Sequence, residues 1–515
     1  MDDAEDKEYG FGPRGRRMRI LYIDCDSLRP DHLGCYGYDR DTSPNIDRLA
    51  SEGRRFTNYY VSDAPCLPSR TALFASRFGV HTGVVDHGGR HATPRRQGSR
   101  GFRTDPRYAS WPRALSRAGV HTASVSPFPS RHDAWHVLEG FEEYHDTGKN
   151  GHELAAEVYD VAEEWLAAHA SDDDWFLHVN FWDPHKPYDV PAEYGNPFAD
   201  DSPPGWLTAE RIDAHRRQYG PHSAGNPQSK GADWGDTWDL PRMPEAIASR
   251  EDFDRWIDGY DVGIRYLDDH VGMLLDLLSA AGVRDETLVV LSADHGENHG
   301  ELNVYGDHHT ADDKTCRVPL VMEGPHVESG VDSGLHYHVD LAPTVMDLCG
   351  EEPPAGWDGQ SFAGGVVADG ECGREFLVTS QGAWACQRGV RWDDWLLLVS
   401  DDHGMKEALD DVMLFDLATD PHETTNLADD RPGVVETGRA LLGRWLDDRL
   451  HETARGENGG DAEAEDGTAD PLREVLREGG PFHTRGRAKP YANYLRSVGR
   501  ADQAERLERR QGIEP

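Results

Sequence analysis

The chain has 515 residues, and its 94 acidic side chains outnumber its 53 lysines and arginines to give a formal net charge of −41. This length provides one large domain, or two to four smaller ones, with a sizeable core. So acidic a protein repels phosphate backbones and anionic lipid, and its sequence has no apolar run of the ~20 residues that span a bilayer. We therefore expect neither nucleic-acid binding nor membrane association.

The acidic composition also bears on the cellular location. Few lysines among many carboxylates are typical of a high-salt cytoplasm, where carboxylates keep a surface hydrated; a merely acidic protein in ordinary salt is the alternative. Residues 1–17 form an acidic extension without the apolar segment of a secretory signal. Seven cysteines, an odd number without a C-x-x-C pair, argue against a disulfide framework and a zinc knuckle. We predict a cytoplasmic location.

Strand and helix signals alternate along the first two thirds of the chain. Short apolar runs predict strands at 18–23, 121–126, 175–181, 287–291 and 318–322. Helical periodicity and end signals predict helices at 44–53, 154–166 and 267–278. This alternation favours an α/β fold, in which helices flank a large, mixed, mainly parallel sheet and ligands bind at the carboxyl ends of its strands.

The rhythm changes twice, which suggests how the chain is divided. A main domain is expected at 18–370, with a long loop at 200–245 that is rich in Pro, Gly, Trp and His and contains a short helix near 209–217. Shorter strands at 376–379, 395–399 and 412–416 predict a smaller C-terminal α+β subdomain, 371–455, with an antiparallel sheet. An acidic linker, 456–470, and a partly helical tail, 471–515, complete the chain.

Two polar clusters follow predicted strands. Asp24 and Asp26 end the first strand, where residues two apart point to one side, and a hard cation would remove the repulsion between their carboxylates. Asp294 and His295 follow the strand 287–291 beside a glycine, which allows close approach to a metal ion. Taken singly, each cluster is equally a set of solvated loop residues. Two strands that end in the same way favour a metal site.

A third cluster precedes a predicted helix that runs through Ser76. Pro68 marks the helix start, which places Cys66 at its amino end, where backbone N–H groups favour an anion. Arg70 provides a bidentate grip on an oxyanion. The alternative is that Cys66 is a small buried hydrophobic residue, as isolated cysteines usually are.

The run Cys66-x-Pro68-Ser69-Arg70 resembles the core signature of the formylglycine-dependent (type I) sulfatases, which belong to the alkaline-phosphatase superfamily. Four further segments between Met18 and Asp430 resemble the family's motifs in the same order. These segments are Asp26 to Gly37, Asp183 to Tyr188, Asp294 to Glu297 with Arg317 to Leu320, and Leu414 to Leu427.

The resemblance implies a mechanism and a set of site residues. A separate maturase oxidises the cysteine to formylglycine (3-oxoalanine), and the hydrated aldehyde is the nucleophile. One divalent cation, Ca²⁺ first and Mn²⁺, Mg²⁺ or Zn²⁺ as alternatives, would be held by Asp24, Asp26, Cys66, Asp294 and His295. The implied catalytic residues are Cys66, Arg70, Arg131, His132, His185 and His308, with His309 as an alternative to His308.

The chain also departs from the family pattern. Ser27 stands where many relatives have a second acidic residue, so Asp24 must replace that carboxylate if one is needed. Ser130-Arg131-His132 is the nearest equivalent of the family's Gly-Lys-x-His segment, although Arg131 and His132 are equally surface residues. Asp307 and His308 occupy the neighbourhood of the family's late lysine.

The predicted activity is hydrolysis of sulfate monoesters, aryl or sugar sulfates, and the loop 200–245 either lines an entrance suited to carbohydrate or is a surface insertion. A phosphonate monoester or phosphodiester hydrolase of the same superfamily is the first alternative, because sulfate and phosphoryl centres have similar shapes. A non-catalytic binding protein on the same fold is the second, and it predicts an unmodified thiol at Cys66.

Overall fold

The computed structural model describes residues 18–95, 106–231, 242–368, 372–454 and 469–513. The predicted extension 1–17 and all but the last two residues of the predicted linker 456–470 lie outside the described residues. The predicted boundaries of the domain 18–370 and the subdomain 371–455 stay predictions. None of the described helices is long and apolar enough to cross a bilayer.

An eight-stranded sheet forms the centre of the molecule, in the order β11-β2-β10-β7-β1-β6-β4-β5. Its strands are β1 (Met18–Cys25), β2 (Arg54–Tyr60), β4 (His121–Val125), β5 (Glu143–His145), β6 (Asp174–Phe181), β7 (Thr287–Ala293), β10 (Arg317–Glu323) and β11 (Gly330–Tyr337). Strand β1 pairs in parallel with both β6 and β7, whereas β10 runs antiparallel to β7 and β2. The predicted mixed, mainly parallel sheet is confirmed.

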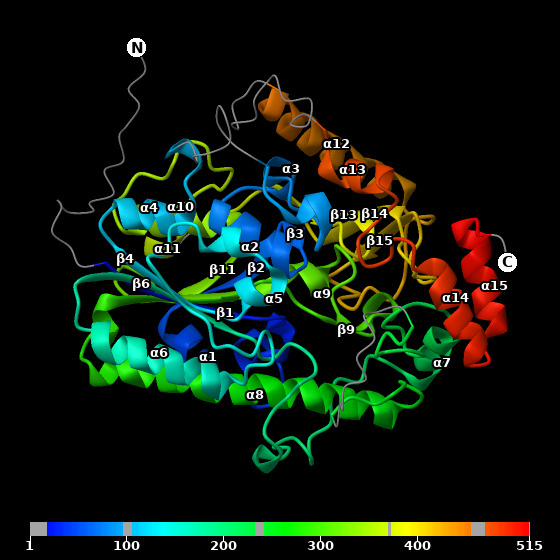
Figure 1. Ribbon diagram of the computed structural model, residues 1–515, viewed down its shortest axis with the longest axis horizontal. Coiled ribbons are helices and arrows are strands. Elements are labelled where there is room, and N and C mark those ends of the chain that lie inside the picture. Colours follow the sequence, from blue (N-terminus) through cyan, green and yellow to red (C-terminus); the bar gives the residue numbers. More distant parts are fainter. Residues whose placement is uncertain (1–17, 96–105, 232–241, 369–371, 455–468, 514–515) are drawn as a thin grey trace.

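Helices cover both faces of this sheet (Figure 1). One face is covered by α1 (Pro44–Glu52), α6 (Ala155–His169) and α8 (Arg250–Ala280), and the other by α2 (Cys66–Ala75), α4 (Trp111–Arg117) and α10 (Leu341–Leu348). Strand β1 is almost wholly buried between the two layers, as its continuous apolar run requires.

Helix α8 is far longer than the predicted helix at 267–278. Its first half carries Asp and Gly residues that interrupt the apolar stripe, and for this reason periodicity alone does not reveal it. One of these residues, Asp261, is fully buried and is neutralised by Arg40 at 2.8 Å, while His32 and Tyr38 also contact its carboxylate. Tertiary ion pairing thus allows the helix to continue through a polar stretch.

A second sheet has the order β15-β14-β13-β12-β3. It contains β3 (Asp63–Ala64), β12 (Phe376–Gln381), β13 (Cys386–Trp392), β14 (Trp395–Asp402) and β15 (Val412–Asp416). Its last four strands are antiparallel, as predicted, and β3 joins the edge in parallel with β12. Because β3 ends at Ala64, the chain passes from the first sheet to the second immediately before Cys66.

The C-terminal third adds helices at the periphery. These are α12 (Pro432–Ala454), α13 (Pro471–Arg477), α14 (Ala488–Ser497) and α15 (Ala501–Gln511). Helices α14 and α15 share a small apolar core with Tyr219 and Met405, and α7 (Ala209–Arg217) lies nearby in the long loop (Figure 1). The tail therefore packs on the body of the protein.

Candidate active site

Four candidate ligand residues meet where β1 and β7 end. Asp26 and Asp294 each follow one of these paired parallel strands directly, so both carboxylates leave the same edge of the sheet. Cys66 is the first residue of α2, which reaches this edge from the opposite side. The ligand atoms of Asp26, Cys66, Asp294 and His295 all lie within 4.8 Å of one another, and all four residues are buried.

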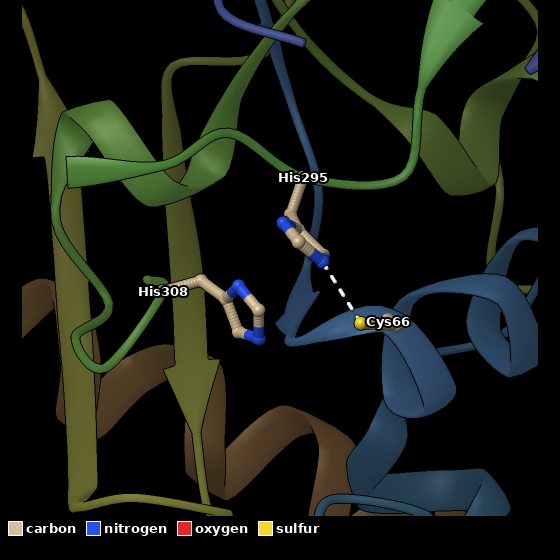
Figure 2. Close-up of side chains that lie close together, drawn as sticks. All are labelled: Cys66, His295 and His308. Carbon is tan, nitrogen blue, oxygen red and sulfur yellow. Dashed lines mark hydrogen bonds between the residues drawn. The ribbon is translucent and has the colours of Figure 1, made fainter. Parts of the chain in front are cut away.

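His295 is oriented by its own backbone. Its Nδ1 lies 2.8 Å from the carbonyl oxygen of Gly296, and since a carbonyl only accepts, Nδ1 carries the proton. The other ring nitrogen, Nε2, points to Cys66 and lies 3.0 Å from its Sγ (Figure 2). A hydrogen bond from the second ring nitrogen is the usual way in which proteins orient a metal-binding histidine.

Arg70 joins the carboxylates from the next turn of α2. Its Nε lies 2.9 Å from Asp24, and its Nη1 lies 3.1 Å from Asp26 and 2.5 Å from Asp294. Burial, the largest single contribution, opposes ionisation of Asp24 and Asp26, but the Arg70 guanidinium and neighbouring histidines together outweigh it, so the pKa of both carboxyls is lowered. Burial, reinforced by the Asp26 charge, raises the pKa of Asp294 to about 7. The single positive charge of Arg70 therefore does not neutralise all three carboxylates.

The residues present fit a divalent cation. Three buried carboxylates face one buried guanidinium, which leaves an excess of negative charge that proteins avoid without a counter-ion. Asp24 Oδ1 is buried and has no hydrogen-bond partner among the described residues. Two carboxylates, an imidazole and a cysteine form a donor set that several divalent metals accept. Asp24 itself contacts Arg70 and His178 and is not one of the four clustered residues, so its predicted role as a ligand stays a prediction.

Cys66 is a poor nucleophile as long as it remains a thiol. Burial raises the pKa of the Cys66 thiol well above its usual range, and the charges of Asp26 and Asp294 raise it further. A thiolate is the nucleophilic form of cysteine, and the carboxylates around this site oppose it. The position at a helix start therefore does not by itself activate the sulfur.

The predicted histidines lie around this cluster at increasing distance. The ring of His308 lies 4.1 Å from that of His295 and faces the same space in Figure 2. The ring of His185 lies 6.3 Å from His308, and His132 stacks on Phe128, whose other contact is the Arg70 guanidinium. Burial lowers the pKa of His185 to about 4 and that of His132 to about 3. Arg131 is exposed, with its aliphatic chain against Gly151.

Several supporting residues escaped the sequence reasoning. His178 Nε2 lies 3.3 Å from Asp24, and Ser69 Oγ donates to the carbonyl of Asp294 at 2.5 Å. The sequence contains a sign of His178, since His178 and Asn180 are the two polar residues in the otherwise apolar strand at 175–181. A second buried group surrounds Asp307, which pairs with Lys186 and lies 3.1 Å from His222 and 3.2 Å from His309. His222 comes from the long loop, whose sequence does not reveal this contact.

Comparison with known proteins identifies the family. Residues 19–351 match the family model described as Sulfatase. The chain belongs to the sulfatase family. The predicted family, fold class and enzyme class of a sulfuric ester hydrolase are thereby confirmed.

Relatives of this sulfatase-family protein have several activities in their names. It is 27% identical to a choline-sulfatase of Rhizobium meliloti, over 82% of this chain and 84% of the relative. It is 22% identical to an N-acetylglucosamine-6-O-sulfatase of Bacteroides thetaiotaomicron, over 80% and 83%. It is 26% identical to the multifunctional alkaline phosphatase superfamily protein PehA of Trinickia caryophylli, over 85% and 96%.

Solved structures share the fold at lower identity. BT4656, solved with D-glucosamine-2-N,6-O-disulfate, superposes with a TM-score of 0.66 at 19% identity, covering 87% of this chain and all of the other. The phosphonate monoester hydrolase of Silicibacter pomeroyi superposes with a TM-score of 0.63 at 19% identity, covering 84% and 96%. Both architectures therefore extend over most of the present chain.

Proposed function

We propose that this protein hydrolyses sulfate monoesters at the site formed by Cys66, Asp26, Asp294 and His295. The observation that carries the proposal is the convergence of these buried groups within 4.8 Å, with a cysteine at the start of α2 inside a family-type signature. A motif match alone would not require that the sulfur and the two carboxylate-bearing segments meet.

The nucleophile and the cation follow from the family resemblance. Oxidation of Cys66 to formylglycine by a separate maturase supplies an aldehyde hydrate as nucleophile, which the buried, protonated thiol is not. A divalent cation, Ca²⁺ first and Mn²⁺, Mg²⁺ or Zn²⁺ as alternatives, supplies Lewis-acid polarisation when held by Asp26, Asp294, His295 and residue 66. The excess negative charge of the cluster supports this assignment.

The remaining residues hold charge and protons. Arg70 spans the three carboxylates and places its guanidinium beside residue 66, where it stabilises negative charge on the attacking group. His308, whose ring lies 4.1 Å from that of His295, is proposed to complete the site (Figure 2). His185 has its Nδ1 proton committed to the carbonyl of Lys186, so its Nε2 can take up the proton that the attacking hydroxyl group loses and return it to the leaving oxygen as general acid. His132 and Arg131, further out, are proposed to assist in binding the sulfate.

The substrate is proposed to be a sulfated carbohydrate or another small sulfated alcohol. Relatives named for N-acetylglucosamine 6-sulfate and a structure solved with a sulfated glucosamine support this choice. A phosphonate monoester hydrolase is the second candidate. A histidine such as His295 among the clustered residues suits Mn²⁺ or Zn²⁺, the stronger Lewis acids that phosphoryl transfer favours, and a phosphonate monoester hydrolase shares the fold.

Two measurements test the proposal. Mass spectrometry of the peptide that contains residue 66, from protein expressed with a maturase, should show formylglycine; an intact thiol in fully active enzyme would contradict the mechanism. Initial rates should then be measured in parallel on p-nitrophenyl sulfate, a phenylphosphonate ester and bis(p-nitrophenyl) phosphate. The sulfate ester should be the fastest, and a dominant phosphonate rate would replace the first candidate by the second.

A further inference from the structure

The C-terminal segment between α13 and α14, which contains Phe482 and His483, contacts loops beside the candidate active site. The backbone N–H of Phe482 donates to the Asp86 carboxylate at 3.2 Å, and that of His483 donates to the carbonyl of Ala383 at 3.1 Å. These two bonds hold the segment between the loop that follows α3 (Gly79–Thr82) and the turn between β12 and β13. The segment lies well beyond the residues that match the family model.

His483 is fixed by two planar neighbours. Its Nε2 lies 3.0 Å from Nδ1 of His87, and its ring stacks on the indole of Trp384 with centroids 4.4 Å apart. The opposite contact of that indole is His309, stacked at 3.8 Å. The C-terminal segment is therefore coupled by direct ring contacts to the residue that follows the candidate catalytic His308.

His87 also belongs to a set of five aromatic and histidine side chains, each in contact with the next, that forms a closed circle beside His295. We call this set the ring rim. Each member lies within 6.5 Å of the next, measured between centroids, and the members in order are His87, His132, Trp182, His185 and His308. The rings of His87, His132 and His185 are partly exposed, whereas Cys66 and His295 are buried. The rim therefore lies between the buried cluster and solvent, and His483 attaches to it at His87.

The chemistry of the rim suits hydroxyl groups. In the bond between His87 and His483 one nitrogen donates and the other accepts, so the two rings are not both imidazolium. A neutral imidazole offers one donor and one acceptor, which is the complement of an alcohol. His87 Nε2 is buried and has no hydrogen-bond partner among the described residues. Buried polar atoms rarely lack a partner, so this nitrogen favours a ligand group at the rim.

We propose that His87 and His483 bind a hydroxyl group on the alcohol part of the substrate, so that the C-terminal segment selects a polyhydroxylated, sugar-like alcohol. This inference rests on the proposed sulfate-ester site and deepens it. It assigns a specificity role to His87, within the residues that match the family model, and to His483, which lies outside them.

The test is calorimetric binding to the full chain with Cys66 as the thiol, which needs no turnover. N-acetylglucosamine 6-sulfate is compared with methyl sulfate, which has the sulfate but no further hydroxyl. Wild-type protein should bind the sugar sulfate at least about tenfold more tightly than methyl sulfate. His483→Ala should weaken sugar binding about five- to tenfold, as expected for the loss of one hydrogen bond, and leave methyl sulfate binding unchanged.

The controls separate this role from a structural one. Lys489→Ala, an exposed position six residues further along, should change neither affinity. His483→Gln keeps a donor and an acceptor and should recover most of the sugar affinity, and it also replaces the alanine variant if that variant does not fold. Absence of a sugar preference in wild-type protein, or an equal effect of His483→Ala on both ligands, would overturn the inference. Failure of the proposed function is read separately, as absent sulfate-ester turnover by the formylglycine form.

Discussion

Replacing Arg70 by methionine tests the charge balance on which the site depends. The guanidinium is buried and contacts Asp24, Asp26 and Asp294 at 2.9, 3.1 and 2.5 Å. Breaking a buried ion pair by removing one partner costs about 3–5 kcal/mol. The lower end applies here, because Asp294, with a pKa of about 7, takes up a proton readily when the positive charge is lost. We therefore expect Arg70→Met to lower the free energy of unfolding by about 3 kcal/mol in EDTA.

A bound cation should reduce this loss. Without Arg70 the carboxylates of Asp24 and Asp26 have no guanidinium beside them in EDTA, even when Asp294 takes up a proton, whereas Ca²⁺ supplies two positive charges in its place. Urea unfolding, followed by tryptophan fluorescence, should therefore show a larger difference from wild type in EDTA than in excess Ca²⁺.

Arg29→Met is the matched control for this experiment. Arg29 is also buried and is paired with Asp31 and Glu301, outside the four clustered residues. Arg29→Met should lower the free energy of unfolding by a similar amount, and this amount should be the same in EDTA and in excess Ca²⁺. A loss below about 1 kcal/mol for Arg70→Met, or one that Ca²⁺ does not change, would refute the proposed charge balance.

Three further predictions concern chemistry, metal and pH. Cys66→Ser should lower kcat on p-nitrophenyl sulfate by at least about 10³ without changing the circular dichroism spectrum, because serine has no aldehyde hydrate; activity within tenfold of wild type would exclude the modified nucleophile. Ca²⁺ at about 100 times its Kd should add about 2.7 kcal/mol to the stability of EDTA-treated protein, and Asp26→Asn should abolish this gain; a gain retained in the variant would place the cation elsewhere. Burial raises the pKa of Asp183 to about 8 from the ordinary 3.8. Between these two pH values the folded protein holds a proton on Asp183 that the unfolded chain has released. The free energy of unfolding of the wild type is therefore highest below pH 3.8 and falls as the pH rises through 8. Asp183→Asn does not titrate, so its stability relative to wild type should rise by up to about 1.4 kcal/mol per pH unit between about pH 5 and 8, whereas parallel unfolding curves would show that Asp183 is ionised throughout.

Most of the sheet could be predicted because its central strands are continuous apolar runs. Strands β1, β6 and β7 are buried on both faces and lie where the sequence predicts them. Strand β2 was not predicted because its sequence from Arg54 to Tyr60, Arg-Arg-Phe-Thr-Asn-Tyr-Tyr, contains neither an apolar run nor a regular alternation of apolar and polar residues. In the structure it lies between β10 and β11, and Arg54 is buried close to Asp332. Pairing of this kind between distant residues leaves no local pattern.

The residues of the candidate site likewise divide into those that local sequence predicts and those that only the fold brings together. The acidic clusters and the Cys66 segment could be found because each carries its chemistry within a few residues of a strand end or a helix start. His178 required knowledge that β6 lies beside β1, and Lys186, His222 and Asp307 come from three segments with no shared pattern. The ring rim is similarly composed of side chains from separate parts of the chain, among them a helix end at His132 and the segment after β6 with Trp182 and His185. Local sequence therefore predicts the reacting groups better than it predicts the residues that surround them.

The second sheet contacts the candidate active site from a part of the chain beyond the residues that match the family model. Strand β12 pairs with β3 directly before Cys66, so the end of this sheet fixes the approach of α2 to the carboxylates. The last residue of β12, Gln381, donates from Nε2 to the carbonyl of His308 at 2.7 Å, and its Oε1 accepts from the N–H of Ala383. One strand end thus supports the start of α2, the backbone of His308 and the turn that carries Trp384. Because these three elements share one support, a shift of the C-terminal sheet would move Cys66 and His308 together, whereas the other four members of the ring rim come from elements that β12 does not hold.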